Sequence, residues 1–510
     1  MLSHKWKIVL PLVAIFMIFA TAEASFANNA SEKVKDLGKV EVTGSRLAED
    51  IVDVPAPAYV VTKEEIDAVG ARNVAEVLDR IPGVMGLTSA SSSMARTQEV
   101  MIRGLGSEIL LLVDGVPFTN TYGMPGSNSF DLRTIPLDSI ERIEVVKGAS
   151  SALYGSAAAA GVINIITRKG YDKSTGFIKA EGGSGGFFRG TVRGTAVLSD
   201  DLRITAGYSK TQETGDVNIR RLTKTNEAAE YDYGTNYDGN DYNFRVDKGA
   251  WSLVGEWGDF LSHYEYDKVP NWQKNDYARV SLNYSDGINT GRIYYRTDNK
   301  DSDSGWDHNQ YDSKSIGVTF NRKQELFNVP FVYGFDWQKQ NGRTYDVNAS
   351  KLNYDKDRSG IAPYVEASIP LGQANLGLGL RYESWNVDDA DNVSEFIPRL
   401  SLNWESPKGK LLYLTAGRYY MMPTLSQILY EGWGAIQSPN LKPEQGWTYD
   451  IGIKDEKAKN PWKLGAFYMD MEDKIIWNTD SWMGEAAYIN VAEYKAWGFE
   501  GQYKFNINDN

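Results

Sequence analysis

Residues 148–155 are the stretch that most directly suggests chemistry, because a glycine-rich loop after a strand can bind phosphate. The segment reads Gly-Ala-Ser-Ser-Ala-Leu-Tyr-Gly and lies between two apolar segments. Phosphate-binding loops also need a lysine followed by serine or threonine, and the N-terminus of a long helix. The loop contains no lysine, and no long helical pattern follows it. Its small residues therefore predict a tight turn that packs closely against a neighbouring surface.

Reactive side chains are scarce elsewhere. The chain has no cysteine and 3 histidines, which excludes disulfides and thiolate sites and argues against a histidine-built metal or catalytic site. A secreted carbohydrate-active enzyme would typically need a carboxylate pair at a defined separation, and no motif singles out such a pair. We therefore expect no catalytic residues.

One acidic run could hold calcium in an extracellular loop, because calcium takes several oxygen ligands, although the spacing does not fit an EF-hand. Its members are Asp298, Asp301, Asp303 and Asp307. The favoured alternative is a solvated loop from Asp298 to Asp312. Apart from this loop calcium, we expect no cofactor.

The charge of the chain argues against nucleic acid as a partner. It carries 67 acidic and 54 basic residues, a formal net charge of −13, whereas a general nucleic-acid binder neutralises phosphates with basic residues. An acidic outer surface or an acidic lumen is the better interpretation.

The first residues predict export. Lys5 and Lys7 precede an apolar run from Ile8 to Ala20, and small residues around Ala27 offer a cleavage site, so residues 1–27 are interpreted as a signal peptide. The run is shorter than the roughly 20 residues of a bilayer-spanning helix, which argues against a membrane anchor. No later stretch is long and apolar enough to span as a helix, so a membrane location would have to be built from strands.

Residues 39–169 have the pattern of a small α/β unit. Asn73 and Glu76 form a capping-box signal for a helix from Val74 to Ile81, which Pro82 and the following glycine end. Four apolar segments predict the strands of a mixed sheet. They are Glu99–Ile102, Ile109–Val113, Arg142–Val146 and Val162–Thr167.

After Gly170, apolar and polar residues alternate, as in residues 202–209, where Leu202 and Ile204 share one face and Arg203 lies on the other. Repetition of this pattern predicts an antiparallel meander of roughly 16 or 17 strands. A soluble β-sandwich also alternates faces. Export, an aromatic content of 12% and strands with polar inner faces favour a membrane β-barrel.

Ordered motifs in the first part of the chain resemble the plug domain of TonB-dependent outer-membrane receptors. They are Gln98–Gly104, Leu111–Pro117, Ile140–Gly148, Ser151–Ser156 and Gly161–Thr167. Later segments are similar to motifs of the family's barrels, namely Tyr420–Ser426, Ser438–Glu444 and Trp497–Gly501. The resemblance implies a mostly β fold, a transmembrane antiparallel β-barrel of about 22 strands with an N-terminal α/β plug domain inside it.

The implied domains are the signal peptide at 1–27, a periplasmic segment at 28–48, the plug at 49–170 and the barrel at 171–510. The resemblance implies a receptor that binds a scarce metal chelate, with a ferric siderophore as the first expectation. TonB and its inner-membrane complex would supply the energy for import into the periplasm. A cobalamin or haem receptor of the same family, and a plugged passive channel or adhesin, are the alternatives. A monomer in outer-membrane lipid is expected.

The resemblance also assigns candidate sites. The TonB-binding segment would comprise Lys39, Val40, Glu41, Val42 and Thr43, which would pair with TonB as an added strand. Ion pairs between plug and barrel would join Arg103 and Lys147 to Glu444 and Glu500.

Apical plug loops would supply the ligand contacts. The candidates are Met94, Arg96, Tyr122 and Met124. No histidine lies between Tyr420 and Glu444, where haem receptors of the family often carry one, so haem is disfavoured. The strand count falls short of the family's, and the chain ends on Asn510 instead of an aromatic residue, so C-terminal strands are expected to be missing.

Overall fold

Two sheets contain most of the residues that the structure describes. The structure is a computed structural model. It describes residues 54, 56–88, 98–122, 130–148, 150–156, 158–222, 228–266, 269–431 and 435–505. We call the described residues up to 170 the plug, and the large antiparallel sheet that follows them the wall.

The plug is built on a 5-stranded sheet in the order β1-β6-β7-β4-β5, in which β4 and β7 are parallel and the other neighbours antiparallel. A hairpin of β2 and β3 accompanies it. The strands are β1 (Ala58–Thr62), β2 (Val84–Thr88), β3 (Gln98–Ile102), β4 (Ile109–Val113), β5 (Val116–Pro117), β6 (Ile140–Lys147) and β7 (Gly161–Thr167). The four predicted strands are confirmed, with ends that differ by two residues or fewer.

Short helices cover this sheet. They are α2 (Lys63–Val69), α3 (Val74–Leu78), α4 (Ser151–Tyr154) and the 3₁₀ turns η2 (Leu132–Thr134) and η3 (Leu137–Ser139). The predicted N-cap of α3 is confirmed, because the Asn73 side chain accepts a hydrogen bond from the Glu76 backbone at 2.9 Å. The predicted end at Ile81 is wrong. After Leu78 the backbone of Ile81 bonds to the carbonyl three residues back, at 3.0 Å, which tightens the chain before Pro82.

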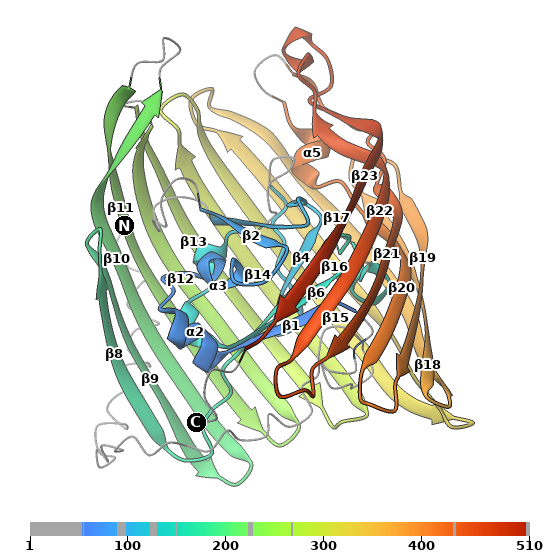
Figure 1. The fold of residues 1–510 in the computed structure, drawn as a ribbon. Helices are drawn as coiled ribbons and strands as arrows, with labels where there is room; N and C mark the ends of the chain where they lie inside the picture. The colour runs from blue at the N-terminus through green and yellow to red at the C-terminus, as the bar shows by residue number, and fades with distance from the viewer. Residues whose placement is uncertain are drawn as a thin grey trace. The chain divides into compact units, whose positions relative to one another are not determined.

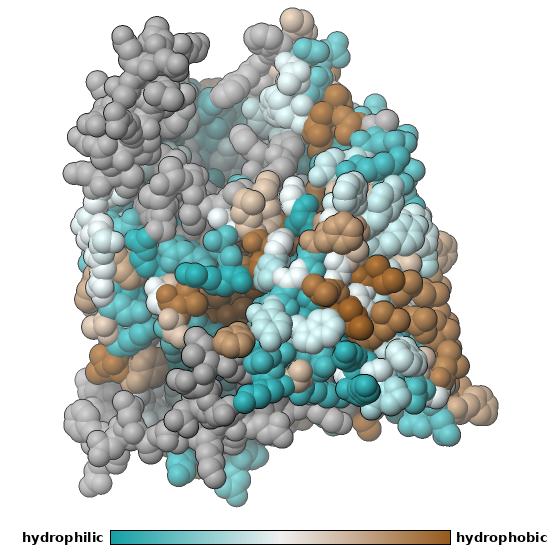
Figure 2. Space-filling view, in the orientation of Figure 1, coloured by the Kyte–Doolittle hydropathy of each residue, from teal (hydrophilic) through white to brown (hydrophobic). Residues whose placement is uncertain are grey.

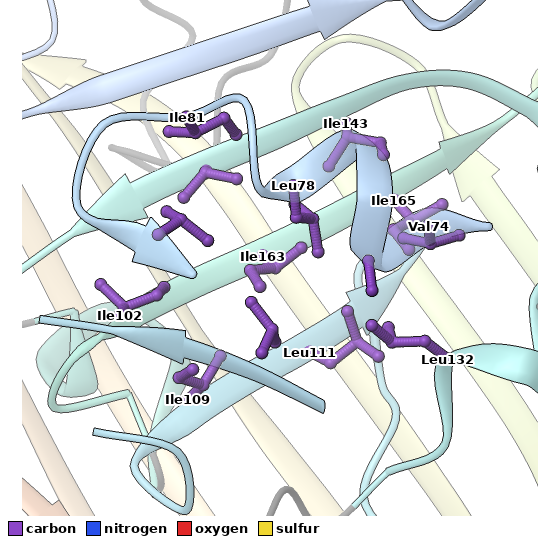
Figure 3. Close-up of a cluster of buried hydrophobic side chains, with 14 of the residues drawn as sticks. Val74, Leu78, Ile81, Ile102, Ile109, Leu111, Leu132, Ile143, Ile163 and Ile165 are labelled. Atoms are coloured by element: carbon purple, nitrogen blue, oxygen red, sulfur yellow. The ribbon is translucent and has the colours of Figure 1, made fainter. Parts of the chain in front are cut away.

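Aliphatic side chains of α3 and the sheet form the plug core. Figure 3 shows Val74 and Leu78 of α3 lying over Ile163 and Ile165 of β7. All four side chains are fully buried. Their burial removes apolar surface from water and fixes α3 on the sheet.

The wall has 16 strands that follow sequence order, each antiparallel to the next. They are β8 (Thr175–Gly183), β9 (Phe187–Ser199), β10 (Leu202–Leu222), β11 (Ala228–Lys248), β12 (Trp251–Tyr266), β13 (Val269–Ser285), β14 (Asn289–Asp303), β15 (His308–Leu326), β16 (Val329–Asp346), β17 (Lys351–Leu371), β18 (Ala374–Val387), β19 (Val393–Glu405), β20 (Leu411–Met421), β21 (Glu444–Asp455), β22 (Trp462–Trp477) and β23 (Tyr488–Tyr503). Helix α5 (Leu425–Leu429) precedes β21, and η4 (Ser481–Met483) precedes β23. The predicted antiparallel meander is confirmed.

The wall buries its polar side chains and exposes its apolar ones. On β18, Arg381 and Glu383 are 4% and 1% exposed, whereas Leu378 and Leu380 are 41% and 44% exposed. Figure 2 shows hydrophobic side chains gathered on the outer face of the strands at the right of the view. This inversion is typical of a membrane β-barrel. In the described part of the chain, no helix is long and apolar enough to cross a membrane.

The loop predicted from Asp298 to Asp312 is mostly strand. β14 continues to Asp303 and β15 begins at His308, so that Asp298 pairs with Ser313. The prediction was wrong because apolar alternation stops in this segment, whereas the backbone hydrogen bonds of an antiparallel ladder need no apolar face.

Candidate functional site

Arg103 joins the plug to two strands of the wall. It follows β3 with a φ of 53°, and its backbone N–H donates to Gly83 at 3.0 Å, which fixes the direction of the side chain. Its Nη2 donates to Asp450 of β21 at 2.6 Å, and its Nε donates to Glu500 of β23 at 3.1 Å. Burial acts to lower the pKa of Arg103, but the two carboxylates hold it above its ordinary value. The buried guanidinium therefore stays charged.

Lys147, the last residue of β6, reaches the same carboxylate. Its Nζ donates to Glu500 Oε2 at 2.8 Å and to the carbonyl of Pro82. The side chain is fully buried. Burial lowers the pKa of Lys147 to about 8, although Glu500 acts to raise it. The lysine is therefore mainly charged at neutral pH but close to losing its proton.

The glycine-rich loop lies directly against the wall. Gly148 and Gly155 have φ values of 88° and 90°, which L-residues with a side chain rarely adopt. A Cβ on Gly148 would collide with the carboxylate of Asp450, and one on Gly155 with that of Glu383. The loop is thus a close-packing element, as its composition predicts.

Plug and wall also line a pocket that is partly open to solvent, and its space of about 770 Å³ includes solvent at the mouth. Tyr154 and Ser156 line it from the plug, and Arg358 and Trp385 line it from β17 and β18. It lies towards the strand ends that carry α5, which appear at the top of Figure 1. A ligand in this pocket would contact both parts of the molecule.

Hydrogen bonds hold the charged side chains of the pocket in place. Arg381 donates to Glu383 at 2.7 Å and to Asp336 at 2.6 Å. The second oxygen of Glu383 accepts from the Trp385 indole at 2.9 Å. Arg358 donates to the Gln340 side chain at 2.6 Å. The polar lining is therefore pre-arranged.

The segment that contains α5 connects the pocket to the plug. α5 begins with a capping box between Thr424 and Gln427. Just before it, the backbone of Met422 donates to Ser156 of the plug at 2.9 Å, and within it Ser426 donates to the Thr121 carbonyl at 3.1 Å. A movement of this segment would therefore be transmitted to plug residues at the pocket.

Two family models match the chain. Residues 184–510 match the TonB dependent receptor-like beta-barrel, and residues 50–162 match the TonB-dependent receptor plug domain.

The chain belongs to the TonB-dependent receptor family. This family consists of receptors and transporters, and its barrels lie in the outer membrane.

Two vitamin B12 transporters, each named BtuB, are similar to this receptor in sequence. The transporter of Photobacterium profundum is 27% identical over 90% of this chain and 74% of its own length. The transporter of Vibrio vulnificus is 26% identical over 91% of this chain and 75% of its own length.

Solved structures share the fold. The siderophore receptor PirA from Acinetobacter baumannii has a TM-score of 0.71 at 18% identity, covering 91% of this chain and 80% of its own. The hemophore receptor HasR of Serratia marcescens, in complex with its hemophore HasA and heme, has a TM-score of 0.72 at 15% identity, covering 89% of this chain and 80% of its own. At these identities the likeness concerns the fold alone.

The structure corrects one partner in the predicted ion pairs of the receptor. Arg103 and Lys147 meet at Glu500, but Asp450 takes the place expected for Glu444. Glu444 accepts a hydrogen bond from the Ile475 backbone at 2.8 Å. Glu444 and Asp450 face the same side of β21, but six residues of strand separate them by about 20 Å. The shared face was readable from the sequence, and the height along the strand was not.

Of the predicted ligand contacts, the structure describes Tyr122. Its hydroxyl donates to Asp298, and its ring centroid lies 5.3 Å from that of Tyr311 on β15. Tyr122 thus anchors the plug to β14 and β15 of the wall. The other predicted contacts, Met94, Arg96 and Met124, and the TonB-binding segment from Lys39 to Thr43, lie outside the described residues.

The four aspartates of the predicted calcium site lie on β14 and in the turn that follows it. Asp301 accepts from Gln310 at 3.2 Å and lies 2.7 Å from His308 Nε2. Within the described ranges, no group of three or more histidine, aspartate or glutamate side chains is placed to hold a metal ion. Calcium binding by this segment stays a prediction.

Sequence reasoning missed Asp450 and the charged residues of the pocket. A partial signal exists for Asp450, because Trp447, Tyr449 and Ile451 are apolar and outward-facing, which assigns the intervening residues to the lumen. That alternation does not show which lumen residue meets the plug.

Proposed function

We propose that this receptor imports a scarce, bulky ligand across the outer membrane, using energy transmitted by TonB. The pocket shared by plug and wall carries this proposal. A ligand seated there contacts Tyr154 of the plug and Trp385 of the wall together, so that its binding acts on the domain that must move.

Charge pairs suit a plug that has to be both retained and displaced. Arg103 and Lys147 face Asp450 and Glu500 with little exposure, so each cation has a carboxylate partner while the plug is seated. When force displaces the plug, water can solvate both sets of charges, which compensates for much of the lost attraction. Pulling from the periplasmic side thereby opens a route that thermal motion alone leaves closed.

Ferric siderophores and corrinoids are the ligand classes that we consider for import. The sequence relatives described above are vitamin B12 transporters, and the solved structures of the same fold include siderophore receptors. We rank haem below both classes, because the segment from Tyr420 to Glu444 has no histidine. We further propose that residues 1–27 direct export, that residues 39–43 pair with TonB and that the protein works as a monomer in the lipid bilayer.

Whole-cell uptake tests this function. Cells expressing the receptor are given labelled cobalamin and labelled ferric siderophores, with Val42→Pro and Val42→Ala variants in parallel. Proline removes a backbone donor from the strand that would pair with TonB, whereas alanine keeps it. We expect uptake by the parent and the alanine variant and its loss in the proline variant. Equal uptake by all three would indicate passive diffusion and would reject energy coupling.

A further inference from the structure

The charged side chains of the described pocket lining, taken together with Asp336 directly behind them, carry no net charge. Its ionisable lining residues include Arg358, Arg381 and Glu383, and Asp336 lies behind Arg381 at 2.6 Å. Arg381 is held between Glu383 and Asp336, so its charge is already neutralised by the wall. These two cations and two anions balance.

Arg358 is the cation of the pocket whose hydrogen-bond partners in the described residues are all neutral. Its Nε donates to the Gln340 amide and its Nη1 to the Pro423 carbonyl, both at 2.6 Å. Its guanidinium carbon lies 5.3 Å from the centre of the Trp385 ring, and 7% of the residue is exposed. Within the described residues, Nη2 makes no hydrogen bond. Arg358 therefore offers one charged donor to a ligand.

The rest of the lining is amide and apolar. Carboxamides come from Asn120, Gln338 and Gln427, and broad apolar surface comes from Trp385 and Met421. Their side-chain oxygens already accept hydrogen bonds from Arg296, Gln340 and Thr424, respectively, so the amide N–H groups are what they can offer, as uncharged donors to ligand carbonyl oxygens. The lining suits a ligand with apolar faces and several amide or hydroxamate groups.

The strand ends near Tyr122 are acidic. Residues 298–312, at the ends of β14 and β15, contain five aspartates and one lysine. Two of these aspartates are paired with arginines, Asp298 with Arg296 and Asp312 with Arg343. The remaining excess of negative charge repels anions as they approach and lowers their rate of entry. This excess of negative charge and the balanced charge of the pocket both disfavour anionic ligands.

We propose, on the basis of the import function above, that the pocket selects a nearly neutral ligand rich in amide-type groups, with one strong acceptor bound by Arg358, and discriminates against polyanionic chelates. Two sources supply this chemistry. One is a corrinoid, which carries amide side chains and a single phosphodiester. The other is a neutral ferric trihydroxamate. Trianionic ferric catecholates are the excluded class.

Equilibrium binding to the purified full-length receptor in detergent tests the proposal without TonB. The probes are cyanocobalamin, ferrichrome and ferric enterobactin, and quenching of tryptophan fluorescence reports binding. We expect cyanocobalamin or ferrichrome to bind at least tenfold more tightly than ferric enterobactin, and the tighter of the two identifies the source. Three outcomes would overturn the proposal: tighter binding of ferric enterobactin, equal affinity for all three probes, or no binding of any probe. Binding without energised uptake would reject the import function alone.

Variants test the role of each charge. Arg358→Gln should weaken binding of the preferred neutral probe about tenfold or more, because a hydrogen bond from a charged donor is lost. Arg343→Gln is the matched control, since Arg343 lies on neighbouring β16, is paired with Asp312 and has a side chain that is 38% exposed. The affinity of the Arg343→Gln variant for the preferred neutral probe should stay unchanged.

Glu383→Gln removes one negative charge from the pocket while preserving the shape of the side chain and an acceptor for Trp385. Affinity for ferric enterobactin relative to the neutral probe should rise about tenfold, as the like-charge penalty falls. An unchanged ratio, in a variant whose circular dichroism matches the parent, would show that charge balance does not set the selectivity.

Discussion

Arg103 Nε and Lys147 Nζ donate to opposite oxygens of one carboxylate, that of Glu500, at 3.1 and 2.8 Å, and Arg103 Nη2 also reaches the oxygen that Lys147 uses, at 3.4 Å. Asp450 provides the second acceptor for Arg103, and the two acids come from strands on either side of β22. The seated plug therefore brings two cations against two anions in a site with little exposure. Removal of one anion would leave a buried cation without full compensation. The free-energy cost of that uncompensated charge is far larger than the net stabilisation that the intact ion pair provides.

Loss of the Glu500 charge should loosen the plug. We expect Glu500→Gln to weaken seating by about 3–5 kcal/mol, the range for removal of one partner from a buried ion pair. In planar bilayers, passive conductance should then appear at a lower urea concentration than for the parent. Glu493→Gln is the control, because Glu493 lies on the same strand with a 65% exposed side chain. Identical urea thresholds for Glu500→Gln and the control would contradict this role.

Plug seating should strengthen with pH above about 8. Burial lowers the pKa of Lys147 to about 8 in the seated plug, whereas an exposed lysine returns towards 10.5. Between these values the displaced state binds more protons, so the free energy that seats the plug increases as pH rises. The slope is at most about 1.4 kcal/mol per pH unit, and it vanishes below the seated pKa.

The urea threshold for conductance, measured at pH 7 and pH 9.5, reports this dependence. Lys147→Met removes the titrating group and leaves Glu500 bonded to Arg103, so the variant should lack this part of the slope. Other groups titrate in both proteins and cancel in the difference. Parallel pH profiles for the parent and Lys147→Met would reject the linkage.

Gly148 should tolerate alanine less well than Gly70. Both have positive φ values, 88° and 63°, so alanine strains the backbone at each by about 1–2 kcal/mol. A Cβ on Gly70 has no heavy atom within 4 Å, whereas one on Gly148 meets the Asp450 carboxylate. We expect a lower urea threshold for Gly148→Ala than for Gly70→Ala. The same threshold for both would mean that the loop moves away from the wall without cost.

Tyr122→Phe should destabilise the receptor. Burial raises the pKa of Tyr122 well above its ordinary value, so the hydroxyl remains a donor to Asp298. Asp298 is 1% exposed, and loss of a partner for such a group costs about 1–3 kcal/mol. Thermal unfolding in detergent should show a lower Tm. Tyr295→Phe is the control, since Tyr295 lies on β14, the strand that carries Asp298, and is 42% exposed. An equal decrease in Tm for both variants would contradict the anchor role of Tyr122.

Sequence patterns predicted the division between an α/β plug and an antiparallel wall because these patterns are local. The sequence of β4 is Ile-Leu-Leu-Leu-Val, an apolar run typical of a buried strand. Asn73 is a typical N-cap residue and predicts the start of α3. The motifs around Arg103 and Lys147 also identified the plug cations that meet Glu500. The end of α3 and the extent of β14 were mispredicted, because composition marks such boundaries weakly.

The sequence by itself determined which face of each wall strand points inward, since alternation with a period of two is a property of the strand alone. Only the tertiary structure decided which inward residues meet the plug. Glu444 and Asp450 share a face of β21, and their difference in height brings Asp450 to Arg103. In the same way, the pairing of β17 and β18 brings Arg358 and Trp385 together from separate strands. These contacts depend on strand register and on the position of the plug against the wall, which arise from interactions between residues far apart in the chain.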